Sequence, residues 1–220
     1  MPRIVIDGNI GSGKTTQLDL LENKGWAVQR EPIAKWPLEA FYKDPSRWAF
    51  YFHMVILQTL RPVETDRPVV YERALMASRW VFWPLMVAKG LVTPDEDKTY
   101  AIFYDQFAWF PDVYIFLAKN LDLAWSHIQK RHQSGDSGVT REYLNELDDG
   151  YTLMLRENVP CKVHIIDANR TPEEIHAEIC HLLQVNELFV NNEERDKVQT
   201  EGGRRWKMSC ASPEQLCRMS

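Results

Sequence analysis

The sequence lacks several features that would place it in other classes of protein. Its four cysteines, at positions 161, 180, 210 and 217, show neither C-x-x-C spacing nor a paired framework, which disfavours a disulfide-stapled secreted domain. We expect reduced thiols in an intracellular, cytoplasmic protein. No apolar run approaches the length of a membrane span, and we expect no targeting segment ahead of the first strand.

A strong excess of charge of either sign is also missing. The 220 residues include 26 Lys and Arg against 31 Asp and Glu, a formal net charge of −5. Binding to a nucleic-acid polymer depends on a clustered basic surface that releases counterions. The near balance of positive and negative charge therefore argues against a nucleic-acid polymer as a partner and favours small-molecule chemistry. In the same way, the missing long apolar run argues against a membrane as a partner.

Hydrophobic residues make up 45% of the chain, enough for one substantial core, so we expect a single domain over residues 1–185. From about Asn186 the periodicity of apolar residues fades, and Asn191-Asn192 and Gly202-Gly203 interrupt it. We expect residues 186–220 to form a polar, mobile C-terminal tail.

Short apolar segments alternate with helical patterns along the domain. Five of them are typical of buried parallel strands: Ile4–Ile6, Trp26–Gln29, Pro68–Tyr71, Val113–Ala118 and Lys162–Ile166. The alternation predicts an α/β fold of three α/β/α layers around a five-stranded parallel sheet. Two longer apolar stretches predict helices over Trp48–Leu60 and Leu75–Lys89, the second kinked or split at Pro84.

The clearest motif is a complete phosphate-binding loop. Residues 8–15 read G-x-x-x-x-G-K-T between a strand pattern and a helix pattern. The glycines let the backbone aim N–H groups at phosphate oxygens, and the following helix adds its dipole. Lys14 would reach the β- and γ-phosphates, and the Thr15 hydroxyl would ligate Mg²⁺. The residues expected around ATP are Gly8, Asn9, Ile10, Gly11, Ser12, Gly13, Lys14, Thr15 and Thr16.

Polar residues follow most of the predicted strands, at the edge where parallel sheets bind ligands. They are Asp7, Glu31, Glu72 with Arg73, and Asp167 with Asn169. Glu31 is the candidate base for the proton of an acceptor hydroxyl. Glu72 could hold a water on Mg²⁺, while Arg73 could contact the acceptor or the phosphoryl group.

Two further patterns leave alternatives open. Lys130 and Arg131 precede the glycine-containing stretch 134–138, which suits a lid over the phosphates or an ordinary helix C-cap.

Aromatic residues are dense, with eight Trp, eight Tyr and nine Phe. Singly each fits a core, but as a set near a phosphate loop they indicate a nucleobase pocket.

Taken together, these motifs resemble the deoxynucleoside kinase family over about residues 3–183. The resemblance rests on the phosphate loop, Glu31-Pro32 with Trp36, Tyr42-x-Asp44-Pro45 with Trp48, Glu72-Arg73, and Arg131 through Asp136 with Tyr143-Leu144. It implies an ATP-dependent, Mg²⁺-requiring phosphotransferase with a lid segment that acts on the 5′-hydroxyl of a deoxynucleoside. It also implies a homodimer joined through helices.

The resemblance further assigns roles to single residues. Glu31 would be the base, assisted by Arg73, with Lys14 on the phosphates. Tyr42 and Asp136 would bind the 3′-hydroxyl. Trp36 and Phe82 would flank the base, with Phe52 and His53 beside it, and Arg131 would bind the phosphates from the lid. Asp167 and Asn169 would contact the adenine of ATP.

The departures from the family pattern bear on the base. His53 stands where the family commonly has a base-reading glutamine, and Leu60 and Ser78 replace an arginine–aspartate pair that favours cytosine. A neutral imidazole cannot offer a donor and an acceptor side by side as an amide does. We therefore expect a thymidine-like pyrimidine. A nucleoside-monophosphate kinase and a catalytically silent subunit of the same fold remain alternatives.

Overall fold

The computed structural model describes residues 1–131 and 136–189. Part of the predicted lid, residues 132–135, and most of the predicted tail, residues 190–220, lie outside the described residues. The last described helix ends at Phe189, a few residues beyond the point where we expected the tail to begin.

Strands and helices alternate as the pattern predicts. The strands are β1 (Arg3–Asp7), β2 (Ala27–Gln29), β3 (Val69–Glu72), β4 (Val113–Ala118) and β5 (Lys162–Asp167). The α-helices are α1 (Lys14–Asn23), α2 (Leu38–Lys43), α3 (Pro45–Thr59), α4 (Leu75–Ala77), α5 (Trp83–Ala88), α6 (Pro94–Phe107), α7 (Leu121–Arg131), α8 (Arg141–Glu157) and α9 (Pro172–Phe189). Short helical turns are η1 (Ile33–Lys35), η2 (Ser78–Phe82) and η3 (Asp136–Gly138).

All five strands are parallel and lie in the order β2-β3-β1-β4-β5. The predicted five-stranded parallel sheet is therefore confirmed, with small differences at the strand ends. Trp26 lies outside β2 because its N–H donates to the Leu21 carbonyl at the end of α1. Pro68, which has no N–H for the ladder, precedes β3, and Glu72 extends that strand by pairing with Ile6.

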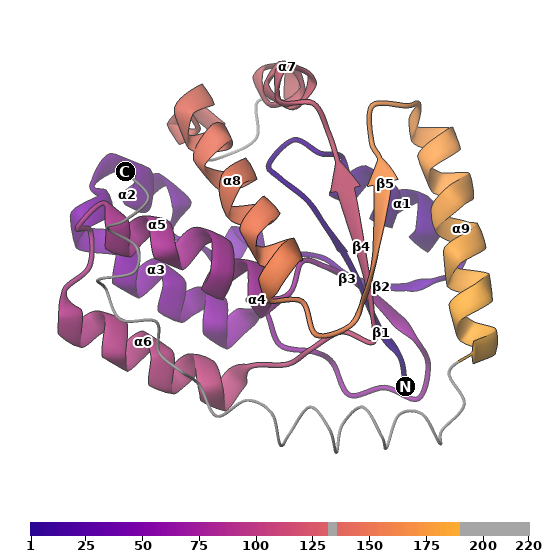
Figure 1. The fold of residues 1–220 in the computed structure, drawn as a ribbon, viewed down its shortest axis with the longest axis horizontal. Coiled ribbons are helices and arrows are strands. Elements are labelled where there is room, and N and C mark those ends of the chain that lie inside the picture. Colours follow the sequence, from indigo (N-terminus) through magenta and orange to yellow (C-terminus); the bar gives the residue numbers. More distant parts are fainter. Residues whose placement is uncertain (132–135, 190–220) are drawn as a thin grey trace.

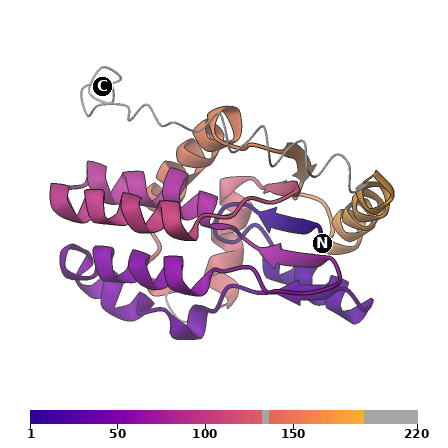
Figure 2. The same ribbon diagram turned by 90° about the horizontal axis from the view of Figure 1, so that it is seen from below.

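Helices cover both faces of the sheet, which gives three layers (Figure 1). One face carries α1 and α9, and the other carries α3, α5, α6 and α8 (Figures 1 and 2). Alternate residues of β1 point to opposite layers: Ile4 and Ile6 pack with α1 and α9, whereas Val5 packs with the other layer. Among the described helices, none is long and apolar enough to cross a bilayer.

The apolar stretch after β3 forms one interrupted helix. It runs from α4 through the π-helical turn η2 into α5, with Pro84 in the first turn of α5. Proline has no N–H to donate to the preceding turn, so the helix widens just before it. The predicted interruption at Pro84 is confirmed, and the widened turn carries Ser78 and Phe82.

The phosphate loop packs against α7. Gly11 has a φ of 80°, and a Cβ atom built there would lie 2.5 Å from the backbone oxygen of Ala124. Gly13 has a φ of 99°, but a Cβ atom there would meet nothing within 4 Å. Glycine is therefore needed at position 11 both for the positive φ of the turn and for the close approach of α7. At position 13 it is needed for the positive φ alone.

This difference can be measured with two alanine substitutions. Gly13→Ala introduces backbone strain of about 1–2 kcal/mol, whereas Gly11→Ala adds overpacking of about 1–3 kcal/mol. We expect Gly11→Ala to lower the Tm by at least about 2–4 °C more than Gly13→Ala does, by scanning calorimetry. Equal decreases in Tm for the two variants would mean that α7 does not constrain the phosphate loop at Gly11.

Candidate active site

The phosphate loop is held ready by its own lysine. Lys14 Nζ donates to the carbonyl oxygens of Gly8 and Asn9, each at 3.0 Å, and Asn9 Nδ2 donates to the Leu144 carbonyl on α8. Burial and the nearby Arg73 charge lower the pKa of Lys14 to about 8. The Lys14 ammonium therefore lies within the loop, at the place where a bound phosphate would neutralise its charge.

Thr15 and Glu72 form a pair of oxygen ligands beside this loop. The Thr15 hydroxyl donates to Glu72 Oε1 at 2.6 Å, and Glu72 is buried. Mg²⁺ in nucleotide sites is held by one or two protein oxygens together with waters and phosphates, so this pair fits a Mg²⁺ ion. No group of three or more His, Cys, Asp or Glu able to hold a metal occurs among the described residues.

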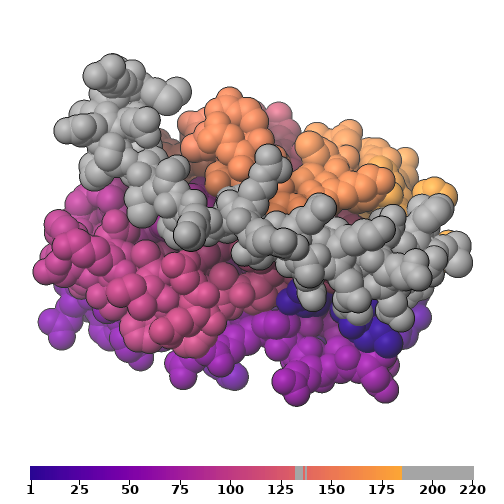
Figure 3. Space-filling view, turned by 60° about the horizontal axis from the view of Figure 1, so that its bottom comes forward, coloured from indigo at the N-terminus to yellow at the C-terminus, as the bar shows by residue number. Residues whose placement is uncertain are grey.

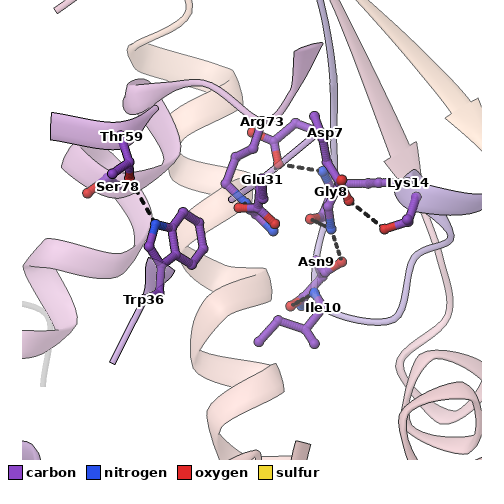
Figure 4. Close-up of polar contacts among 12 residues, drawn as sticks. Asp7, Gly8, Asn9, Ile10, Lys14, Glu31, Trp36, Thr59, Arg73 and Ser78 are labelled. Atoms are coloured by element: carbon purple, nitrogen blue, oxygen red, sulfur yellow. Dashed lines mark hydrogen bonds and ion pairs between the residues drawn. The ribbon is translucent and has the colours of Figure 1, made fainter. Parts of the chain in front are cut away.

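Glu31 and Arg73 meet at the carboxyl edge of the sheet, as the strand ends predicted. Arg73 Nε donates to Glu31 Oε1 at 2.7 Å, and both side chains are almost fully buried. Figure 4 shows the two side by side, between Trp36 and the phosphate loop. Burial raises the pKa of Glu31, which the Arg73 charge partly opposes. A carboxylate so tuned suits proton abstraction.

Three residues that the sequence did not assign surround Arg73. Asp7 Oδ1 accepts from Arg73 Nη1 at 3.0 Å. Tyr151 on α8 donates to the same oxygen and contacts Nη1 as well, while Tyr114 on β4 donates to Asp7 Oδ2. Asp7 was visible as a strand end, but neither tyrosine carried a sequence signal.

Aromatic residues from several elements lie near Glu31 and Arg73. Phe82 lies 5.0 Å from the Arg73 guanidinium, measured to its ring centroid. Trp36 meets Phe52 edge-on at 6.0 Å and donates its indole N–H to Thr59 Oγ1. Phe82 therefore lies against Arg73 and Trp36 beside Glu31 (Figure 4), with Phe52 packed against Trp36, and rings of this kind suit a base pocket.

His53 is enclosed among aromatic rings. Its Nδ1 lies 3.2 Å from Ser78 Oγ, which in turn lies 2.9 Å from the Tyr100 hydroxyl. Tyr100 stacks on Trp83 at 3.8 Å between ring centroids. Burial lowers the pKa of His53 to about 3, so the imidazole is neutral at physiological pH.

The described part of the lid is built around an ion pair. Arg131 donates to Asp136 through two nitrogens, Nε at 2.9 Å and Nη2 at 2.7 Å. Burial and the Asp136 charge raise the pKa of Tyr42 to about 12, and Gly138 lies directly against its ring. Tyr42 and Asp136 thus lie together as predicted, while Arg131 pairs with Asp136 in this structure.

Asp167 ends β5 and Asn169 follows it, at the same edge of the sheet. Asn169 donates to Asp167, and its side-chain oxygen accepts from the Asn120 N–H at the start of α7. Both residues are exposed. This loop is thereby tied to the helix that packs on the phosphate loop, and their predicted role at the adenine remains a prediction.

A phosphate loop beside a buried carboxylate–guanidinium pair, in a sheet of this order, is the site of a nucleotide-dependent phosphotransferase. The family model for deoxynucleoside kinases matches residues 4–190. The chain belongs to the deoxynucleoside kinase family and is an ATP-dependent phosphotransferase.

Individual relatives agree with this assignment. A putative kinase protein of Invertebrate iridescent virus 6 is 30% identical over 81% of this chain and 95% of its own length. Human mitochondrial thymidine kinase 2 is 26% identical over 92% of this chain and 79% of its own. A structure of deoxyadenosine kinase from M. mycoides has a TM-score of 0.75 at 23% identity, covering 83% of this chain and 98% of its own; it supports the fold.

The buried His53 predicts how stability depends on pH. Its pKa is about 3 when folded and about 6.5 when unfolded, so the unfolded chain binds more protons between these values. Stability is complete above about pH 6.5 and falls as the pH drops toward 3, by up to about 1.4 kcal/mol per pH unit. Urea unfolding from pH 7 to 4.5 should show a shallower loss for His53→Gln.

The exposed His181 supplies the control. His181→Gln should keep the wild-type dependence of the unfolding free energy on pH. If His53→Gln and the wild type lose stability in parallel, His53 is protonated in the folded protein.

Proposed function

We propose that this protein transfers the γ-phosphoryl group of ATP to the 5′-hydroxyl of a deoxynucleoside. The observation that carries the proposal is the buried pair of Glu31 and Arg73, which lies between the phosphate loop and the aromatic residues (Figure 4). A donor phosphate on the loop and a base among the aromatic rings would bring the sugar to Glu31.

The proposed reaction assigns one task to each charged side chain. Lys14 binds the β- and γ-phosphates and neutralises their charge. Glu31 accepts the proton of the 5′-hydroxyl as its oxygen attacks the γ-phosphorus, and ADP leaves. Arg73 binds Glu31 through Nε and would direct Nη2 toward the acceptor. The lid residue Arg131 would exchange Asp136 for phosphate when both substrates are bound, leaving Asp136 and Tyr42 to the 3′-hydroxyl.

Thr15 and Glu72 would hold Mg²⁺, Thr15 directly and Glu72 through a bound water. The hydrogen bond between their oxygens brings both to the phosphate side of the site. When bound, the ion neutralises charge on the β- and γ-phosphates.

For the base, we favour a thymidine-like pyrimidine over deoxycytidine, because Leu60 and Ser78 replace the arginine–aspartate pair that favours cytosine. His53 uses Nδ1 on Ser78, so its Nε2 is the ring nitrogen left to a ligand. One nitrogen makes a single hydrogen bond, whereas an amide makes two. Relatives named for deoxycytidine, thymidine and deoxyguanosine occur in the family, so membership alone leaves the base open.

We also propose a homodimer formed by α3 and α6. These helices pack against each other, and Tyr51 on α3 and Ile102 on α6 are 55% and 59% exposed. In Figure 3 the magenta surface of α6 lies on the outside of the molecule. A helical interface would remove both of these apolar side chains from water. The intracellular location stays a prediction.

Replacing the proposed base tests the mechanism. Glu31→Gln keeps the shape and a hydrogen-bond acceptor but cannot take the proton, so kcat should fall by about 10² or more. The Kd for ATP should stay within about twofold of the wild type, by titration calorimetry. A variant with full turnover would show that another group is the base.

A second substitution tests the base reader. His53→Gln should raise the relative kcat/KM for pyrimidine deoxynucleosides, because the amide offers a donor and an acceptor together. An ATP-dependent phosphorylation assay across the four deoxynucleosides and thymidine monophosphate measures the profile. An unchanged profile would exclude His53 from base recognition, and preference for the monophosphate would favour the nucleoside-monophosphate kinase alternative.

A further inference from the structure

Arg73 has an unusual backbone conformation at the centre of the site. Its φ is 65°, and among the described residues it is the single non-glycine with positive φ. This left-handed conformation disfavours any residue with a Cβ atom. Its N–H donates to the Ile6 carbonyl at 3.0 Å, so the strained residue is tied to β1. Such strain persists only where surrounding contacts determine it.

The contacts that determine it converge on Asp7. Asp7 follows Ile6 on β1 just as Arg73 follows Glu72 on β3, and Ile6 pairs with Glu72. The two side chains therefore start at matching points of neighbouring strands. The Asp7 carboxylate is fully buried, with an exposed fraction of 0%. A carboxylate at this depth needs partners for its charge.

Asp7 has four such partners. Oδ1 accepts from the Gly8 N–H at 2.7 Å, from Arg73 Nη1 at 3.0 Å and from the Tyr151 hydroxyl at 3.0 Å. Oδ2 accepts from the Tyr114 hydroxyl at 2.7 Å. Tyr151 also contacts Arg73 Nη1 directly. One side chain from β4 and one from α8 thus fix the carboxylate that holds the guanidinium.

This arrangement divides the guanidinium between two carboxylates. Nε binds Glu31 Oε1 and Nη1 binds Asp7. Within residues 1–131 and 136–189, neither Arg73 Nη2 nor Glu31 Oε2 has a hydrogen-bond partner. Glu31 is therefore held at Nε through Oε1 alone, while Asp7 holds the guanidinium at Nη1. Glu31 Oε2 and the two N–H groups of Arg73 Nη2 are left to face the substrates.

We propose that Asp7, fixed by Tyr151 and Tyr114, is a positioning residue that holds the Arg73 guanidinium in the orientation in which Nε alone binds Glu31, so that Glu31 Oε2 is left to the acceptor hydroxyl. Being fully buried, Asp7 acts through Arg73 and touches no substrate. The predicted loss of kcat in Asp7 variants rests on the proposed kinase function. The predicted loss of order at the Arg73 guanidinium does not depend on that function.

Kinetics test the first consequence. Tyr151→Phe removes one hydroxyl and should lower kcat about tenfold, and Asp7→Asn should lower it about 10²-fold, with KM for ATP within about twofold in both. Asp7→Glu, which restores the charge, should recover part of the loss. Tyr71→Phe is the matched control, because Tyr71 lies two residues before Arg73 and packs its ring on Trp109 instead; it should behave as the wild type.

A spectroscopic measurement tests the second consequence without requiring turnover. In protein carrying isotope-labelled arginine, the Arg73 Nε–H signal, assigned by its loss in Arg73→Lys, should exchange slowly with solvent. In Asp7→Asn and Tyr151→Phe it should exchange at least about tenfold faster, and in Tyr71→Phe it should not change.

Two results would overturn the proposal. The first is an Arg73 signal that is equally protected in all variants. The second is a raised KM for ATP with unchanged kcat, which would mean that Asp7 serves the phosphate loop through Gly8. If the wild type phosphorylates no nucleoside, the proposed function fails, and the exchange measurement still decides the role of Asp7.

Discussion

The structure depends on one buried charge arrangement, the Arg73 guanidinium between Asp7 and Glu31. Charged groups are removed from water at this depth only when each has partners. Arg73 binds both carboxylates, and Tyr114 and Tyr151 complete the partners of Asp7. Since these residues come from different strands and from α8, the arrangement links the layers of the fold at the point where chemistry is expected.

The rest of the site follows from this arrangement and from the phosphate loop beside it. Lys14 is held by carbonyl oxygens of the loop, and its pKa is lowered to about 8 by burial and by the Arg73 charge. Glu31 has a raised pKa for the same main reason, burial. Burial therefore makes the charge on Lys14 costly, and a bound phosphate would offset that cost. Family membership and electrostatics lead to the same class of reaction.

Much of the fold was predictable because it depends on short-range patterns. Apolar runs predicted all five strands, and Pro84 predicted the interruption that became the π-helical turn. Glu31, Glu72 and Arg73 were also predictable, because polar residues after parallel strands share one edge of the sheet. The pairing of Arg131 with Asp136 and the enclosure of His53 by Ser78, Tyr100 and Trp83 could not be predicted. The first depends on how the end of α7 and the start of η3, five residues apart, are placed relative to each other, and the second on the packing of α3 against α5 and α6.

The sequence by itself determined the donor site and the identity of the charged residues at the strand ends, because a phosphate loop and a β/α alternation are local properties of the chain. Only the tertiary structure decided what Arg73 does with its donors. Tyr151 lies 144 residues from Asp7, and no spacing or periodicity relates them. The contact exists because α8 packs over the centre of the sheet, where β1 ends.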